Sequence, residues 1–140
     1  MSADRTFVDT NVFAYLFDDS EPKKQASAGK RLEQEQRERE LVVSTQVLQE
    51  LYVALTRGKS PIASPEVAER AVREVSTYTV AQVDSTAVFA AIATSRQSRI
   101  SFWDALIVRA AADSGCSVLL SEDLNDGQVI EGVRVENPFA

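Results

Sequence analysis

The chain of 140 residues is 44% hydrophobic and 26% charged, the balance of one soluble globular domain over residues 1–140. Fifteen Lys and Arg against 21 Asp and Glu give a net charge of −6, which excludes a general basic surface for nucleic acid but allows a local acidic pocket that holds cations. Histidine is absent and there is one cysteine, so Ser-His-Asp chemistry, His-ligated zinc and an intrachain disulfide are excluded.

The first half of the chain alternates short apolar strands with helices. A strand is predicted at 6–8 and an apolar helix at 12–17. Ser20 and Pro22 open a second helix that runs to about residue 38, and the charges at 34–40 are typical of a solvated helix face. A buried strand follows at 41–43, and Ser44 then caps a helix that ends near residue 56.

The second half continues the alternation after a loop at 57–61. Ser64 opens a helix to about residue 74, a strand is predicted at 79–83, and Asp84 caps a helix to about residue 98. Ser101 caps a helix over 102–113 that Gly115 ends, and strands are predicted at 118–120 and 133–135. This order predicts an α/β fold with a mostly parallel, twisted sheet and helices on both faces.

Neither a leader nor a membrane segment is expected from the sequence. The first residues lack a basic-then-apolar pattern, and the longest uncharged stretch has 11 residues, from Ser85 to Ser95. A stretch of that length is too short to span a bilayer, so we expect a cytoplasmic protein.

Four acidic side chains stand near the ends of these elements. Asp9 and Asp123 come just after apolar strands, where ligands bind to parallel sheets, although Asp9 also suits a helix cap and Asp123 a turn. Glu50 borders the apolar stripe of its helix, as a surface glutamate does too. Asp104 falls inside the apolar arc of its helix, where Ser101 offers capping-box spacing. Taken together, the four are expected to converge at one edge of the sheet.

Carboxylates that converge repel one another, and a hard divalent cation relieves that repulsion. Because the donors are all oxygen, they favour Mg²⁺ or Mn²⁺ over zinc.

Four segments carry a family resemblance. FVDTNV at 7–12, VLQEL at 47–51, FWDALI at 102–107 and LSED at 120–123 are similar, in order and spacing, to the four signature blocks of the PIN-domain nucleases. Within that family the chain looks most like the compact VapC-type toxins of bacterial toxin–antitoxin pairs. The resemblance covers essentially the whole chain and implies a PIN-like fold of three layers, similar to the Rossmann fold.

The resemblance also assigns roles to single residues. It makes the acidic, metal-binding and catalytic pocket out of Asp9, Glu50, Asp104 and Asp123. Asn11 and Ser121 match positions that orient the acids by hydrogen bonds. Asp126 stands in for a further acid of some members, but the loop at Gly127 departs from the commoner Asp-x-Asp-Phe form. The fourth ligand is therefore open between Asp123 and Asp126.

These residues lead to the hypothesis of metal-dependent hydrolysis of an RNA phosphodiester. One or two Mg²⁺ or Mn²⁺ ions would activate water and neutralise charge on the phosphate, with Glu50 as a ligand or acting through water. Since an acidic pocket repels phosphate, substrate binding needs nearby cations. The candidates, each of which also suits an exposed solubilising charge, are Arg57, Lys59, Arg96 and Arg99.

Two other functions stay open from the sequence. One is a PIN-like binding module with an intact but idle pocket, although the presence of all four acids argues against a degenerate copy. The other is a phosphohydrolase of the haloacid-dehalogenase type with Asp9 as nucleophile, whose pattern wants a second Asp where Asn11 stands.

Partners are implied by the resemblance. They are a small antitoxin that blocks the acidic pocket, often with a basic side chain, and a second copy in a homodimer built on helices. The apolar residues at 12–17 exceed one helical face, which fits a buried helix or an interface, and we expect a buried helix.

Overall fold

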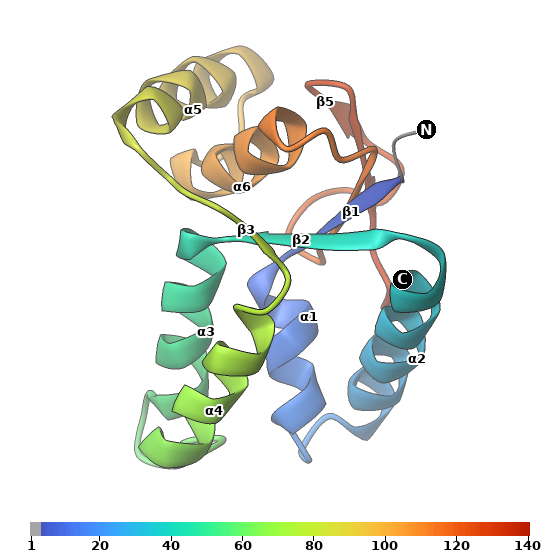
Figure 1. The fold of residues 1–140 in the computed structure, drawn as a ribbon, viewed down its shortest axis with the longest axis vertical. Coiled ribbons are helices and arrows are strands. Elements are labelled where there is room, and N and C mark those ends of the chain that lie inside the picture. The colour runs from blue at the N-terminus through green and yellow to red at the C-terminus, as the bar shows by residue number, and fades with distance from the viewer. Residues whose placement is uncertain (1–3) are drawn as a thin grey trace.

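The computed structural model describes residues 4–140, and its strands form one mostly parallel sheet (Figure 1). In chain order the strands of this part of the chain are β1 Arg5–Val8, β2 Glu40–Ser44, β3 Thr79–Ala81, β4 Val118–Leu120, β5 Val129–Ile130 and β6 Val133–Glu136. They stand side by side in the order β3-β2-β1-β4-β6-β5. Every neighbouring pair is parallel except β5 and β6.

Helices cover both faces of this sheet. They are α1 Thr10–Ala14, the 3₁₀ helix η1 Tyr15–Phe17, α2 Pro22–Glu38, α3 Thr45–Thr56, α4 Pro65–Val75, α5 Ser85–Ser98 and α6 Phe102–Asp113. Figure 1 shows α5 and α6 on one side of the sheet and α1 to α4 on the other. The predicted α/β fold of three layers is therefore confirmed.

The predicted caps begin the helices. Ser44, Ser64 and Ser101 each accept a hydrogen bond from the backbone N–H three residues ahead, and Asp84 does the same for α5. These bonds satisfy backbone donors that the first turn of a helix leaves without partners. Local capping chemistry thus sets where α3, α4, α5 and α6 start.

The core lies on both faces of the central strands. Phe7 and Val8 of β1 are fully buried, as is Leu119 of β4, which is the burial expected of parallel strands covered on two sides. In α1, Val12 and Phe13 are buried too, so the apolar helix belongs to the core as expected. No helix within residues 4–140 has the length and apolar character needed to cross a membrane.

Several sequence expectations differ from the structure. The sequence predicted β6 but not β5, because β5 has two residues and forms by pairing across a turn in which Glu131 and Gly132 both adopt positive φ. The segment 34–40 was expected to be a solvated face, which is wrong at Glu35. That side chain is 1% exposed and accepts hydrogen bonds from Arg31, Arg39 and Thr6.

The sheet order also places the site. β1 lies between β2 and β4, so the chain first adds β2 next to one edge of β1 and later adds β4 next to its other edge. Ligands bind parallel sheets at such a switch point, outside the carboxyl ends of the strands. Here β1 leads directly into Asp9, whose backbone N–H donates to Leu120 O at 3.0 Å and extends the β1–β4 pairing by one residue.

Candidate active site

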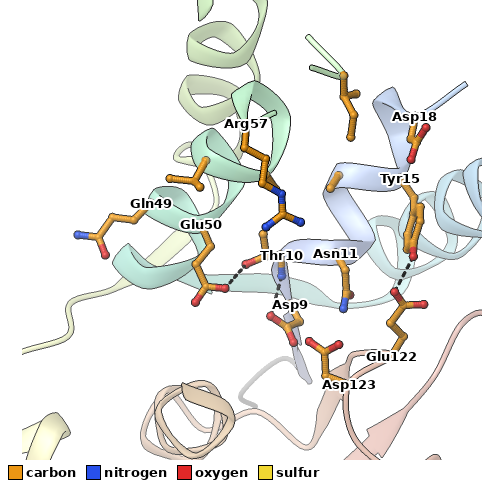
Figure 2. A pocket seen from close by; sticks show the side chains of 14 residues that line it. Asp9, Thr10, Asn11, Tyr15, Asp18, Gln49, Glu50, Arg57, Glu122 and Asp123 are labelled. Carbon is orange, nitrogen blue, oxygen red and sulfur yellow. Dashed lines mark hydrogen bonds between the residues drawn. The ribbon is translucent and has the colours of Figure 1, made fainter. Parts of the chain in front are cut away.

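A cleft of about 570 Å³ opens at this switch point (Figure 2). It is strongly acidic, and its carboxylates come from the ends of β1 and η1, from α3 and from the loop after β4. They belong to Asp9, Asp18, Glu50, Glu122 and Asp123. Among the described residues that line the cleft, Arg57 is the one cation. The sequence reasoning anticipated three of the acids and this arginine.

Asp9 is the buried acid at the bottom of the cleft. Its side chain is 4% exposed and accepts hydrogen bonds from Thr10 N at 2.7 Å and Ser121 Oγ at 2.8 Å. Burial raises the pKa of Asp9 from 3.8 to about 7, and the charges of Asp123 and Glu50 add to the rise, while the two hydrogen bonds oppose it. Asp9 therefore carries charge at neutral pH only at a cost, which a cation in the cleft would remove.

Asp123 faces Asp9 from the loop after β4, and Figure 2 shows the two carboxylates pointing toward one another. Ser121 connects them, because its Oγ donates to Asp9 and accepts from Asp123 N at 3.1 Å. Burial raises the pKa of Asp123, and the charges of Asp104, Glu122 and Glu50 act in the same direction. The side chain of Asn11 acts against them.

Glu50 lies one helix away, on the side of α3 that faces the cleft. Gln46 Nε2 donates to its Oε1 at 2.5 Å, and Thr10 Oγ1 lies 3.4 Å from its Oε2. Gln46 is one helical turn earlier, so the pair is set by the spacing of α3. Two donors thus orient the Glu50 carboxylate toward the cleft, although the residue is exposed.

Of the four acids expected to converge, Asp104 is the one that does not line the cleft. It lies in the first turn of α6, where its backbone N–H donates to the cap Ser101 Oγ at 3.0 Å. Of the neighbouring charges that raise the pKa of Asp123, that of Asp104 is the largest, so it borders the acidic group from the α6 side.

The loop after β4 separates Asp126 from the cleft. Asp126 is exposed, and its Oδ1 accepts the backbone N–H of Asn137 at 2.8 Å, so it closes a turn against the end of the chain. Of the two acids left open by the sequence, Asp123 is the one that lines the cleft.

The predicted RNA-contacting cations divide in the same way. Arg57 ends α3 as its C-cap and reaches into the cleft, as Figure 2 shows. Lys59 is in the exposed loop that follows, whereas Arg96 and Arg99 lie at the end of α5, outside the lining of the cleft.

The sequence reasoning missed the polar group at the mouth of the cleft. Tyr15 Oη donates to Glu122 Oε1 at 2.6 Å, and Lys24 Nζ lies 3.1 Å from both Glu122 Oε2 and Tyr15 Oη. Phe139 packs edge-on against Tyr15 at 5.0 Å between ring centroids. The one sequence signal for this polar group was the position of Glu122 beside Asp123. Tyr15 and Lys24 are distant from Glu122 in the sequence and contact it only in the folded chain.

The donors of the cleft suit a hard cation. Asn11 Oδ1 is buried there without a hydrogen-bond partner, and the nearby ligand atoms are carboxylate oxygens. Within residues 4–140 no three acidic side chains are close enough together to hold one ion by themselves. Mg²⁺ needs only one or two carboxylates, because it keeps several water molecules in its shell. The residues of the cleft therefore fit such an ion.

The chain belongs to the PIN domain family, whose model matches residues 6–126. This confirms the family predicted from the four sequence blocks. No curated protein matches the sequence.

Solved structures share the fold at low sequence identity. VapBC2 of Rickettsia felis, bound to a DNA fragment from its promoter, has a TM-score of 0.69 at 18% identity over 95% of this chain and 98% of that one. A toxin–antitoxin complex from Klebsiella pneumoniae has a TM-score of 0.70 at 19% identity, over 95% and 97%. VapC20 of Mycobacterium tuberculosis, a toxin that cleaves the sarcin-ricin loop, has a TM-score of 0.59 at 18% identity, over 81% and 86%.

Proposed function

We propose that this protein is a ribonuclease that hydrolyses RNA phosphodiester bonds with Mg²⁺ or Mn²⁺, and that it acts as the toxin of a toxin–antitoxin pair. The observation that carries the proposal is the buried Asp9, whose pKa is raised to about 7 beside Glu50 and Asp123 at the switch point of the sheet. A carboxylate held this way gains most from a bound cation. Membership of the PIN domain family supports the same activity.

Asp9 and Asp123 are the first ligands we assign to the ion, with Asp104 approaching from α6 and Glu50 binding directly or through water. The orphaned Asn11 Oδ1 offers a neutral oxygen beside them. A bound divalent ion would lower the pKa of a water molecule and neutralise charge on the phosphate. The set of donors leaves open whether one or two ions bind.

The residues around these ligands position them and the substrate. Ser121 fixes the spacing of Asp9 and Asp123, and Gln46 holds Glu50. Arg57 is the cation we assign to the RNA phosphate, because a guanidinium binds two phosphate oxygens at once and this one faces the acids. Lys59, Arg96 and Arg99 contribute, at most, to longer-range attraction of the strand.

Partners follow from the same proposal. The solved neighbours from Rickettsia felis and Klebsiella pneumoniae are toxin–antitoxin complexes, which supports a small antitoxin partner for this chain. An excess of carboxylates in the cleft favours a basic side chain of that antitoxin as the blocking group. We assign the interface of a homodimer to α5, where Phe89 and Ile92 expose apolar surface.

The test compares the wild type with Asp9→Asn, Asp123→Asn and Asp126→Asn on a labelled RNA, with Mg²⁺ or Mn²⁺ and with EDTA. Cleavage by the wild type is expected to need the ion. Asp9→Asn and Asp123→Asn are expected to lose cleavage while keeping the wild-type circular dichroism spectrum. Asp126→Asn is the matched control and retains cleavage, since its carboxylate lies outside the cleft.

Two results would reject the proposal. One is full metal-dependent activity in both cleft variants. The other is a wild type that binds RNA but never cleaves it with either ion, which is the behaviour of an idle binding module.

A further inference from the structure

The one tryptophan of the chain is exposed. Trp103 shows 64% of its surface to solvent, although burying an aromatic side chain of this size stabilises a fold. Among the residues that line the acidic cleft and those that hold its acids, no other aromatic ring is as exposed within the described part of the chain. A large aromatic residue that is exposed beside a polar site indicates a binding surface.

Trp103 is tied to the cleft by its backbone. It directly precedes Asp104 in the first turn of α6, and its carbonyl oxygen accepts a hydrogen bond from Gln46 Nε2 at 3.3 Å. The same Gln46 amide donates to Glu50 Oε1 at 2.5 Å. The Gln46 side chain therefore connects the backbone of Trp103 to an acid of the cleft, and places the start of α6 beside it.

The indole is also held in place before any ligand arrives. Phe102 contacts it edge to face, with ring centroids 5.1 Å apart and an angle of 73° between the planes. Phe102 in turn packs against the small cluster of Ala91, Ala105 and Leu106 between α5 and α6. A ring fixed in this way loses little conformational freedom when a flat group stacks on it.

Charge alone gives this cleft a weak hold on RNA. The protein carries a net charge of −6, and Arg57 is the one cation among the described residues that line the cleft. Proteins that bind single strands combine phosphate contacts with base stacking on aromatic rings, and stacking strengthens binding by roughly 5- to 150-fold per base. An exposed tryptophan beside the cleft is suited to such a stacking contact.

We infer that Trp103 is a stacking platform for an unpaired RNA base next to the phosphate that enters the cleft. The inference rests on the proposed nuclease function and assigns a base-binding residue beside its cleft. Only a base outside a duplex offers its face to a side chain, so the segment that reaches Trp103 must be unpaired. The strand would run from Trp103 on the α6 side, past the acids, to Arg57 at the end of α3.

The first experiment uses the tryptophan as its own reporter. Asp9→Asn protein, which keeps the strand uncut, is titrated with a short mixed-sequence RNA in the presence of Mg²⁺ while the emission of Trp103 is recorded. Single-stranded RNA is expected to quench the emission, and the same RNA annealed to its complement is expected not to. Equal quenching by both forms, or by neither, would overturn the inference.

The second experiment measures cleavage kinetics. Trp103→Leu is expected to raise KM for single-stranded RNA roughly 5-fold or more with kcat nearly unchanged, and Trp103→Phe is expected to restore part of the loss. Val129→Ala is the matched control, because Val129 is an apolar residue of equal exposure (64%) on β5, outside the lining of the cleft. A KM that Trp103→Leu leaves unchanged would overturn the inference while the nuclease function stands.

A competing occupant of the tryptophan has its own signature. If a second copy of the chain covers Trp103, its emission shifts to shorter wavelength as the protein concentration rises without RNA, and this would overturn the inference. If the wild type proves unable to cleave RNA, the proposed function fails, and the quenching experiment alone then decides whether Trp103 stacks on a base.

Discussion

At Asp9 the fold places a carboxylic acid where little of it is exposed to water. Its two hydrogen bonds, from Thr10 N and Ser121 Oγ, stabilise the charged form, yet burial and the charges of Asp123 and Glu50 outweigh them and raise its pKa to about 7. Such a conflict between a group and its surroundings is common where a site must bind a ligand, because stability is given up for function.

The first prediction concerns the effect of Asp9 on stability. In the unfolded chain the pKa is 3.8 and in the fold about 7, so the folded state binds the proton more tightly. Stability from this group is therefore full below about pH 4 and is lost as the pH rises through 7. Asp9→Asn has no ionisable group at this position, so it does not lose this stability. Without metal, the free energy of unfolding of the variant minus that of the wild type should therefore rise by about 3 kcal/mol from pH about 4 to about 7.

Urea titrations across that range, in EDTA, measure this difference. Parallel pH profiles for the wild type and Asp9→Asn would show that Asp9 ionises without cost, and would contradict the raised pKa.

A second prediction concerns Ser121, which holds both cleft acids. Ser121→Ala removes a hydrogen bond that lowers the pKa of Asp9, so protons compete more strongly with a bound cation. The rise in Tm that Mn²⁺ produces in the wild type should require a higher ion concentration in the variant, by roughly tenfold for each unit of pKa. This deficit should be larger at pH about 6 than at about 8.5.

Ser117→Ala is the control for that titration, because Ser117 is an exposed serine just before β4, the strand that Ser121 follows. A Mn²⁺ response equal in Ser121→Ala and the wild type at both pH values would mean that Ser121 does not position the ligands.

Among the elements, α2 contains a charge that the sequence pattern hides. Glu35 sits in a run of alternating charges, yet the fold buries it against Thr6 of β1 and surrounds it with Arg31 and Arg39. Arg31 also pairs with Glu136 of β6. This network connects α2 to β1 and β6. The end of α2 therefore has an exposed face and, on its other face, the buried ion pairs of Glu35.

The third prediction follows from that network. Glu35→Ala leaves two arginines without their buried partner and should lower the free energy of unfolding by about 3 kcal/mol, as measured by urea denaturation. Glu33→Ala is the matched control, because its pair with Arg37 on the same helix is exposed, and it should cost less than about 0.5 kcal/mol. Similar losses in the two variants would make the Glu35 network no more than a surface pair.

Elements with strong local signals were predictable, and those made by tertiary pairing were not. Caps such as Ser44 and Ser101 are local chemistry, so the starts of α3 and α6 follow from the sequence. β5 has only two residues and forms because β6 pairs with it. The sequence of β5 alone carries no signal for that pairing. Likewise, one helix was expected over 12–17, whereas α1 begins at Thr10 and tightens into η1 at Tyr15.

For the whole molecule, the sheet order decides which predicted site residues meet. Asp9 and Asp123 follow neighbouring parallel strands, so the alternation of strands and helices was enough to bring them together. The positions of Glu122, Tyr15 and Lys24 were not predictable, since their contacts join η1 and α2 to the loop after β4. Nor did the sequence separate Asp123 from Asp126, because the turn that takes Asp126 away closes on Asn137.

The last prediction is the salt dependence of RNA binding by this acidic protein. Each phosphate that a cation neutralises on a single strand contributes about −0.7 to the slope of log affinity against log salt concentration. With a net charge of −6 and Arg57 as the assigned contact, the slope at constant Mg²⁺ should be shallow, between about −0.7 and −2. Arg57→Gln should remove about 0.7 of it, measured as the change in KM with KCl, whereas Arg96→Gln on α5 should leave the slope unchanged. A steep slope that Arg96→Gln reduces and Arg57→Gln does not would place the RNA along α5 and away from the end of α3.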